Sequence, residues 1–219
     1  MLREMTNSKA ILNPQYEVEI RCHFANPDEA CRIIPFLHNC LTHNMVWESS
    51  IYGREFFKSG QLLRMSKDIV DNDLTYYLGW KGCDIGTFAN IREEIDEVIT
   101  HGIEESQILK KLGISQQSTL YRAGIIRELT LLGHRRFMSF KGYDLLGGYE
   151  PLGVKMKLMV CKKLKRQVLV EIEKAASSIE EALVREEELR EFCNLFGLHS
   201  RLVREEPPAL LYTSKFSSE

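Results

Sequence analysis

Apolar and polar positions alternate most clearly over residues 16–24. In this run Glu17, Glu19 and Arg21 alternate with the apolar residues Tyr16, Val18, Ile20, Cys22 and Phe24. Side chains of a β-strand point to its two faces in turn. One face can therefore pack under helices, while the other presents ions to water, a metal or a ligand.

A second strand with paired carboxylates is predicted over residues 167–173. Glu171 and Glu173 share one face, and the opposite face carries Val168, Val170 and Ile172. Either strand alone also fits a sheet face that is exposed to water. Taken together, the two acidic pairs offer the oxygen ligands that a divalent cation such as Mg²⁺ requires.

Other strand-like runs carry mostly basic side chains. Residues 154–161 place Lys155, Lys157 and Cys161 on one side, and the remaining runs contain Arg64, Lys81, Arg92, Glu94 and Asp96. Cations and carboxylates thus recur on the same kind of strand. A ligand with several negative charges and a bound metal needs this combination, so polyphosphate is the predicted ligand class.

Helices are predicted between the strands. Asn26 caps a helix that has Pro27 at its first position and apolar spacing to Leu41, with an interruption at Pro35. A capping box at residues 178–181 begins a helix that ends at Gly197, and its acidic run 186–188 is predicted to face water. Residues 104–112 and 115–132 predict two more helices.

Composition narrows the function classes. Lys and Arg number 29 against 31 Asp and Glu, so a formal charge of −2 gives no global basic field for nucleic acid. The apolar runs are short for a membrane span and the start has no signal-peptide pattern, which predicts a cytoplasmic protein without a membrane partner. The 6 cysteines sit singly, as reduced thiols do.

The charged motifs, taken in order, resemble the CYTH or triphosphate tunnel superfamily. The motifs are Glu17-x-Glu19-x-Arg21, Leu63-Arg64, Trp80-Lys81-Gly82, Arg92-Glu93-Glu94-Ile95 and Glu171-Ile172-Glu173. This superfamily includes class IV adenylyl cyclases, thiamine triphosphatases, tripolyphosphatases and some RNA triphosphatases. Residues 192–198 and 208–211 are similar to the closing helix and Leu-Leu ending of the cyclase-like branch.

The resemblance implies an α+β fold, with an eight-stranded antiparallel β-barrel around a charged tunnel and helices packed outside. Residues 15–212 would form one tunnel domain with a helical insert near 101–133. The N-terminus, 1–14, would be disordered or loosely packed, and 213–219 would be a flexible tail.

The resemblance also implies roles for individual residues. Mg²⁺ or Mn²⁺ would be bound by Glu17, Glu19, Glu171 and Glu173. Phosphate would be bound by Arg21, Arg64, Lys81, Arg92, Lys155, Lys157, and by Arg135 or Arg136 of a basic strand. Glu17, Glu19 and Lys81 would be catalytic, and Glu94 and Cys161 would also face the tunnel.

Three positions depart from the family pattern. Arg21 stands where the family usually has Lys, Cys161 where an acid is expected, and Gln167 where Gly is frequent. Arginine keeps the charge but replaces a point donor by a planar fork. The loss of an acid at Cys161 bears directly on the number of metal ions and on catalysis.

The sequence therefore predicts a metal-dependent enzyme that acts on ATP, tripolyphosphate or thiamine triphosphate. The reaction would be cyclisation of ATP to cyclic AMP and pyrophosphate, or hydrolysis. One alternative is an RNA 5′-triphosphatase in which Arg122 and Arg127 contact RNA. Another is a nucleotide- or polyphosphate-binding protein without activity, which Cys161 favours. The segment 120–129 fits a packing helix, a homodimer face or a tunnel lid.

Overall fold

The computed structural model describes residues 15–162 and 168–216 of the 219-residue chain. The strands are β1 (Gln15–Phe24), β2 (Leu41–Tyr52), β3 (Leu62–Val70), β4 (Asp73–Lys81), β5 (Asn90–Val98), β6 (Arg136–Tyr149), β7 (Val154–Val160) and β8 (Val168–Ala176). The helices are α1 (Pro27–Ile33), α2 (Leu37–Cys40), α3 (Arg54–Lys58), α4 (Gln107–Lys111), α5 (Arg122–Leu131), α6 (Ile179–Phe196) and α7 (Pro207–Phe216), with short 3₁₀ turns η1 (Glu150–Leu152) and η2 (His199–Arg201).

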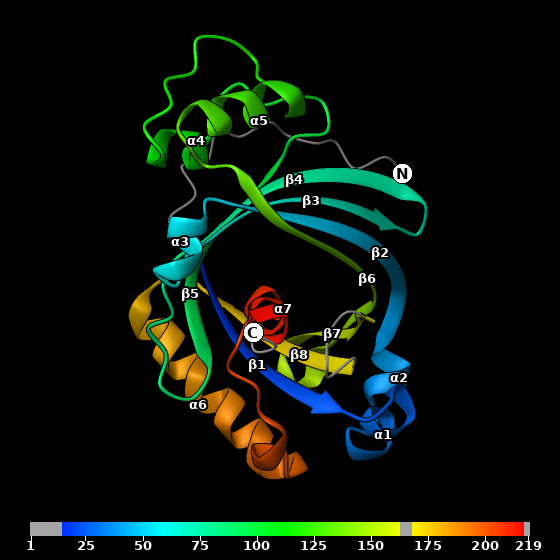
Figure 1. The fold of residues 1–219 in the computed structure, drawn as a ribbon. Helices are drawn as coiled ribbons and strands as arrows, with labels where there is room; N and C mark the ends of the chain where they lie inside the picture. The colour runs from blue at the N-terminus through cyan, green and yellow to red at the C-terminus, as the bar shows by residue number, and fades with distance from the viewer. Residues whose placement is uncertain (1–14, 163–167, 217–219) are drawn as a thin grey trace, which may run out of the picture.

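The eight strands of the described residues close into an antiparallel barrel in the order β1-β5-β4-β3-β2-β6-β7-β8 (Figure 1). Closure leaves no unpaired sheet edge among them, because each strand pairs on both sides. One face of every strand points into the lumen and the other points outward. The prediction of an eight-stranded antiparallel barrel with external helices is confirmed.

Helix α6 covers the outer face of β1 and β8 (Figure 1). Ser178 caps it by accepting a hydrogen bond from the Glu181 backbone N–H at 3.2 Å, and Gly197 ends it with a φ of +62°. The predicted helix boundaries are therefore confirmed. Removal of apolar surface from water drives this packing. The cluster includes Ile20, Cys22, Val170, Ile172, Leu189 and Phe192.

The acidic run of α6 differs from its prediction at one residue. Glu186 is buried, and its carboxylate accepts hydrogen bonds from the backbone N–H groups of Thr87 (2.8 Å), Phe88 (2.6 Å) and Ala89 (2.9 Å). Burial alone would raise the pKa of Glu186, but these donors hold it below its ordinary value. The contact fastens the loop before β5 to α6.

The first predicted helix is divided in two. The Asn26 side chain accepts a hydrogen bond from the Glu29 backbone N–H at 2.9 Å, and Pro27 opens α1 as expected. Helix α1 ends at Ile33, because Pro35 has no N–H and disfavours helical backbone before it. The chain resumes in the four-residue α2 and enters β2 at Leu41, which was expected to be helical.

The 101–133 insert forms two short helices on the outer face of β3 and β4. Ser106 caps α4 by accepting from the Leu109 backbone N–H at 2.9 Å. Backbone hydrogen bonds of 2.9 Å in both directions join Ile103 to Leu120. These bonds use backbone groups of the predicted 115–132 helix, so α5 begins only at Arg122. The insert packs with Met65, Leu78, Trp80, Ile108, Leu109, Ile125 and Leu129 in one apolar cluster.

Helix α7 lies across one end of the barrel (Figure 1). Its Leu211 and the preceding Val203 pack with Leu62, Phe140 and Leu169 of the barrel wall. The helix continues to Phe216 and so passes Tyr212, where the domain was expected to end. This end of the lumen is filled by apolar side chains.

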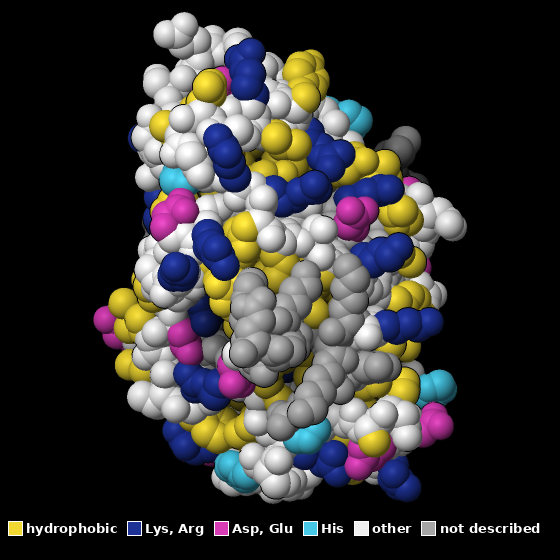
Figure 2. Space-filling view, viewed as in Figure 1, with side chains coloured by type: hydrophobic (Ala, Val, Ile, Leu, Met, Phe, Trp, Pro, Cys, Tyr) yellow, Lys and Arg dark blue, Asp and Glu magenta, His cyan; other side chains and the backbone are white. Residues whose placement is uncertain are grey.

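Figure 2 shows the molecule from the same side as Figure 1. Basic, acidic and apolar side chains are interspersed on the described surface there, in keeping with the small formal charge of −2. Within residues 15–162 and 168–216, no helix combines the length and the hydropathy that crossing a membrane requires.

Candidate active site in the barrel lumen

Strands β1 and β8 place the predicted acidic pairs side by side in the lumen. The strand register sets Glu19 opposite Glu173 and Arg21 opposite Glu171. Directly opposite residues of an antiparallel pair have their Cβ atoms about 4.5–5.5 Å apart. The alternation read in both strands therefore brings distant residues into one ionic cluster.

Glu17, Glu19 and Glu173 form an acidic trio whose ligand oxygens all lie within 4.8 Å of one another. Burial raises the pKa of Glu17 to about 7, although Lys81 opposes the shift. The pKa of Glu19 lies well above its ordinary value, and that of Glu173 is also raised, first by burial and then by neighbouring carboxylates. A hard divalent cation fits this trio, because it supplies oxygen ligands and compensates the crowded negative charge.

The fourth predicted ligand, Glu171, is held by cations instead. Its carboxylate lies 2.7 Å from Arg21 Nε and 2.5 Å from Lys157 Nζ. Burial alone would raise the pKa of Glu171, but Lys157 and Arg21 hold it below its ordinary value. Glu171 is thus a partner in buried ion pairs, and the trio lies beside it.

Basic side chains and two members of the acidic trio, Glu17 and Glu173, share a cavity of about 370 Å³. Arg64 donates to Glu94 at 3.1 Å and to Asp96 at 2.9 Å. Lys81 pairs with Glu17 and lies 3.4 Å from Glu94. The predicted site residues that line this cavity are Glu17, Arg64, Lys81, Glu94, Lys155, Lys157 and Glu173.

Gly79 makes room for the Arg64 side chain on the neighbouring strand. A Cβ at this position would lie 2.8 Å from Arg64 Nε and 2.4 Å from Asp96 Oδ1. Any other residue would therefore displace the guanidinium or its partner. This requirement for close approach explains a glycine in the middle of β4.

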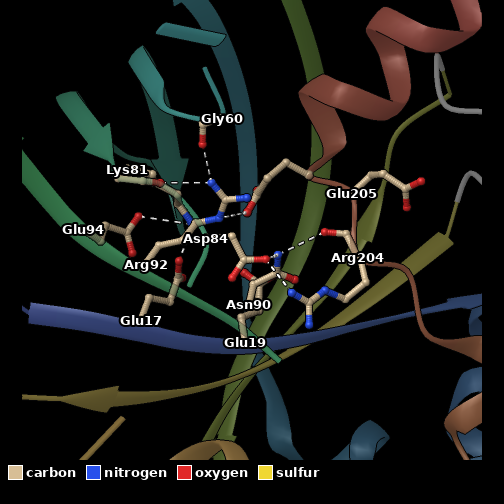
Figure 3. Close-up of polar contacts among 12 residues, drawn as sticks. Glu17, Glu19, Gly60, Lys81, Asp84, Asn90, Arg92, Glu94, Arg204 and Glu205 are labelled. Atoms are coloured by element: carbon tan, nitrogen blue, oxygen red, sulfur yellow. Dashed lines mark hydrogen bonds and ion pairs between the residues drawn. The ribbon is translucent and has the colours of Figure 1, made fainter. Parts of the chain in front are cut away.

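Two predicted phosphate ligands, Arg21 and Arg92, do not line the cavity of about 370 Å³. They also lie outside the second cavity of the lumen, which is described below. The buried Arg21 guanidinium contacts Glu19, Glu171 and the Glu205 carbonyl at 2.9 Å. Arg92 donates to the carbonyls of Gly60 (2.8 Å) and Gly82 (3.0 Å) (Figure 3). Both arginines also pair with a residue that the sequence did not indicate.

That residue is Glu206, immediately before α7. Its carboxylate lies 3.3 Å from Arg21 Nη2 and 3.5 Å from Arg92 Nε. Burial opposes its ionisation, but Arg21 and Lys81 lower its pKa to about 2. Glu206 therefore neutralises the basic end of the lumen, next to the apolar side chains below α7.

The remaining predicted site residues line neither cavity. Arg135 and Arg136 are exposed near the start of β6. Cys161 is buried in the apolar cluster below α7, and its Sγ donates to the Lys141 carbonyl at 3.4 Å. The side chain at this position therefore lies among apolar neighbours and not in either cavity.

A second cavity, of about 500 Å³, adjoins the first and shares Arg64, Lys81, Asp96, Lys155 and Lys157 with it. Its other wall is formed by β2 and β6, with Trp47, Phe140 and Asp144 in the lumen. The lumen therefore contains an ionic cavity and an adjoining, more apolar cavity.

A closed antiparallel barrel with an ionic lumen and external helices is the triphosphate tunnel fold, and this chain has that CYTH-like fold. It is similar to the PH1819 protein from Pyrococcus horikoshii OT3 at 21% identity, with 90% of this chain and 99% of that chain covered and a TM-score of 0.67.

Two further solved structures share the fold. A putative adenylate cyclase from Vibrio parahaemolyticus is 13% identical, with 91% of this chain and 99% of that chain covered and a TM-score of 0.63. The putative adenylyl cyclase HpAC1 from Hippeastrum, described as having a dominant triphosphatase activity, is 13% identical, with 91% and 96% covered and a TM-score of 0.57. The sequence matches no protein-family model and no curated protein.

Proposed function

We propose that this chain is a metal-dependent phosphoryl-transfer enzyme that binds a triphosphate in the barrel lumen and hydrolyses it. The observation that carries this proposal is that Glu17 and Glu173 of the acidic trio meet the basic side chains in one cavity of about 370 Å³, with Glu19 within 4.8 Å of both carboxylates. The shared fold with putative adenylyl cyclases, one described as having a dominant triphosphatase activity, supports it.

The basic side chains would bind the phosphate oxygens. Arg64 offers a planar fork of donors, while Lys81, Lys155 and Lys157 are point charges that follow a flexible chain of phosphates. Glu94 and Asp96 hold the Arg64 guanidinium in place before the substrate arrives. Fixed charges of this kind supply much of the catalysis in phosphoryl transfer, since they need little reorganisation during reaction.

The acidic trio would bind Mg²⁺ or Mn²⁺. When bound, such an ion polarises a phosphoryl oxygen and helps to deprotonate an attacking water. Glu17 belongs to the trio and also pairs with Lys81, so it would link the metal-binding and phosphate-binding sides of the cavity. Glu171 would orient Arg21 and Lys157 rather than bind the ion.

Cyclisation of ATP to cyclic AMP and pyrophosphate is the second candidate. The adjoining cavity of about 500 Å³ favours it, because that volume lies in the range that accommodates small organic ligands. For the RNA alternative, the proposed contact residues have other partners. Arg122 lies 4.8 Å from the Tyr76 ring centroid, and Arg127 pairs with Glu128 at 3.1 Å.

The test is to incubate the purified chain with ATP, tripolyphosphate, thiamine triphosphate or 5′-triphosphate RNA, with Mg²⁺, Mn²⁺ or a chelator. Orthophosphate release that depends on the metal is expected, and cyclic AMP with pyrophosphate would identify the cyclase reaction. Glu173→Gln should abolish turnover. Glu48→Gln, an exposed carboxylate on the outer face of β2, is the matched control that should retain it.

Binding of a triphosphate without release of any product would leave a binding protein and overturn the enzymatic proposal. Equal turnover with and without the chelator would overturn the metal dependence. Equal rates in wild type and Glu173→Gln would remove the acidic trio from the reaction.

A further inference from the structure

The second cavity differs in chemistry from the phosphate-facing one. It is lined by Met45, Trp47, Phe140, Asp144, Leu146 and Met159, in addition to the charged residues that it shares with the first cavity. Cavities that bind small organic molecules are mostly apolar, with a few polar groups that set the orientation of the ligand. The second cavity has this composition.

A glycine on the neighbouring strand makes room for the Trp47 indole. Trp47 on β2 pairs with Gly142 on β6, where a Cβ would lie 2.5 Å from the indole Cζ2. Phe140 meets the indole edge to face, with ring centroids 5.2 Å apart and an interplanar angle of 84°. The aromatic wall is therefore fixed in place before any ligand binds.

Asp144 brings a buried carboxyl into the same cavity, and its Oδ1 has no donor at normal hydrogen-bond geometry. Asp144 is 1% exposed. Within the described part of the chain, neither Asp144 Oδ1 nor Trp47 Nε1 makes a hydrogen bond of normal geometry. Buried polar groups in folded proteins nearly always have a partner, so each exception needs an explanation.

The nearby charges do not supply that partner. Lys157 faces Asp144, but its Nζ lies 2.5 Å from Glu171 and 3.4 Å from Glu173. Asp68 and Glu171 also face Asp144 and carry the same charge. Burial raises the pKa of Asp144 to about 7, although Lys157 and the nearby Trp47 indole oppose the shift. A ligand that brings a donor would satisfy this carboxyl.

We propose that the second cavity binds the organic part of the triphosphate substrate, a heteroaromatic ring with an exocyclic amino group. The amino group would donate to Asp144, and the ring would lie beside Trp47 and Phe140. This inference rests on the proposed function, because the triphosphate in the first cavity sets the position of the ring. Adenine, cytosine and the aminopyrimidine of thiamine share this chemistry, whereas uracil and inorganic tripolyphosphate do not.

The first experiment uses Trp47 as a fluorescent reporter. The chain has 2 tryptophans, and the other one, Trp80, lies on the outer face of β4, so Trp80→Phe leaves Trp47 alone. ATP, CTP and thiamine triphosphate should change the emission of this variant on binding. Tripolyphosphate should bind, as measured by calorimetry, with little change in emission.

The second experiment measures affinities by calorimetry with a chelator present, so that no turnover occurs. Asp144→Leu should weaken ATP binding about tenfold, the effect of losing one hydrogen bond to a buried group, and leave UTP and tripolyphosphate unchanged. Asp144→Asn keeps an acceptor oxygen and should retain most of the ATP affinity. Glu48→Leu is the matched control on the outer face and should leave all ligands unaffected.

The outcomes separate this inference from the proposed function. If tripolyphosphate binds as tightly as ATP, and Asp144→Leu affects both or neither, the ring site is overturned while the triphosphate site stands. If neither ligand binds the wild-type chain, the proposed function fails and this inference fails with it. If Asp144→Leu does not fold, the Trp47 emission with ATP and with tripolyphosphate decides the question. Whichever of ATP and thiamine triphosphate binds more tightly identifies the kind of ring that the cavity prefers.

Discussion

The wall made by β1 and β8 carries buried charges in contact with one another, whereas the wall made by β2 and β6 carries aromatic rings and one buried carboxyl, Asp144, whose Oδ1 has no donor at normal hydrogen-bond geometry. Both walls use the same strand geometry, so the difference lies in side chains alone. On the ionic wall, Arg21 and Lys157 hold the pKa of Glu171 below its ordinary value. Each carboxylate of the acidic trio also contacts a cation, but burial and mutual repulsion raise the pKa values of all three. A metal ion would favour the ionised form of such a cluster.

The largest expected difference is between two neighbouring carboxylates of β8. Glu171→Gln removes one partner of a buried ion-pair network and should destabilise the fold by about 3–5 kcal/mol. Glu173→Gln relieves repulsion within the acidic trio and should leave the stability unchanged or higher. Urea unfolding of the metal-free protein measures the free energy of unfolding of both variants. Equal losses would show that the two carboxylates are equivalent and would contradict the separation drawn here.

A pH titration compares the two walls in one protein. The folded-state pKa of Glu17 is raised from 4.5 to about 7 and that of Asp144 from 3.8 to about 7. Because both pKa values are raised, their contribution to stability is fully present below about pH 4 and is lost as the pH rises to 7, by at most roughly 3–4 kcal/mol for each group.

The measurement is thermal unfolding of the metal-free protein between pH 4 and pH 8. Mg²⁺ should restore stability near pH 7 through Glu17, because the cation favours the ionised trio. In the Asp144→Asn variant, the Asp144 contribution to the fall of stability with pH should disappear, and the Glu17 contribution should remain. A stability that rises steadily from pH 5 to pH 7 in the metal-free protein would contradict both assignments.

Lys81→Ala should weaken triphosphate binding roughly ten- to a hundredfold and monophosphate binding much less, since a longer anion contacts more of the cavity. Lys67→Ala is the matched control, because Lys67 lies on the outer face of β3. Calorimetry with each anion compares the two variants. Similar losses for triphosphate and monophosphate would place Lys81 outside the phosphate path.

The smallest effect is expected at Cys161. Its thiol lies in the apolar cluster and donates to the Lys141 carbonyl, a bond that serine can also make. Cys161→Ser should cost about 1 kcal/mol through the burial of a more polar group, with turnover unchanged. A large loss of turnover at unchanged stability would instead return Cys161 to the active site.

The parts of the fold that could be predicted are those where local signals agree. The alternation in β1 and β8 placed Glu17, Glu19 and Glu173 on one face, and strand pairing joined them. The Ser178 cap and Gly197 set the limits of α6, because capping acts through neighbouring residues.

The rest depended on contacts that no local pattern carries. Glu206 follows a charged loop, and only the return of α7 to the barrel end brings it to Arg21 and Arg92. The bridge between Ile103 and Leu120 shortened a helix that its own residues favour. Asp144 drew no attention in the sequence, because its burial and its unpaired Oδ1 become visible only once the barrel closes.

The apolar end below α7 makes the lumen a blind channel. A linear polyanion can enter such a channel only by its end, whereas an open pore would admit the middle of a long chain. Arg21 and Arg92 compensate the charge of Glu206 at the closed end, so the stop that an advancing phosphate chain would meet there is the packed apolar side chains. If the lumen binds a phosphate chain as proposed, the channel would select it by length: a terminal group of limited extent would enter, and the remainder of a longer polymer would stay in solvent.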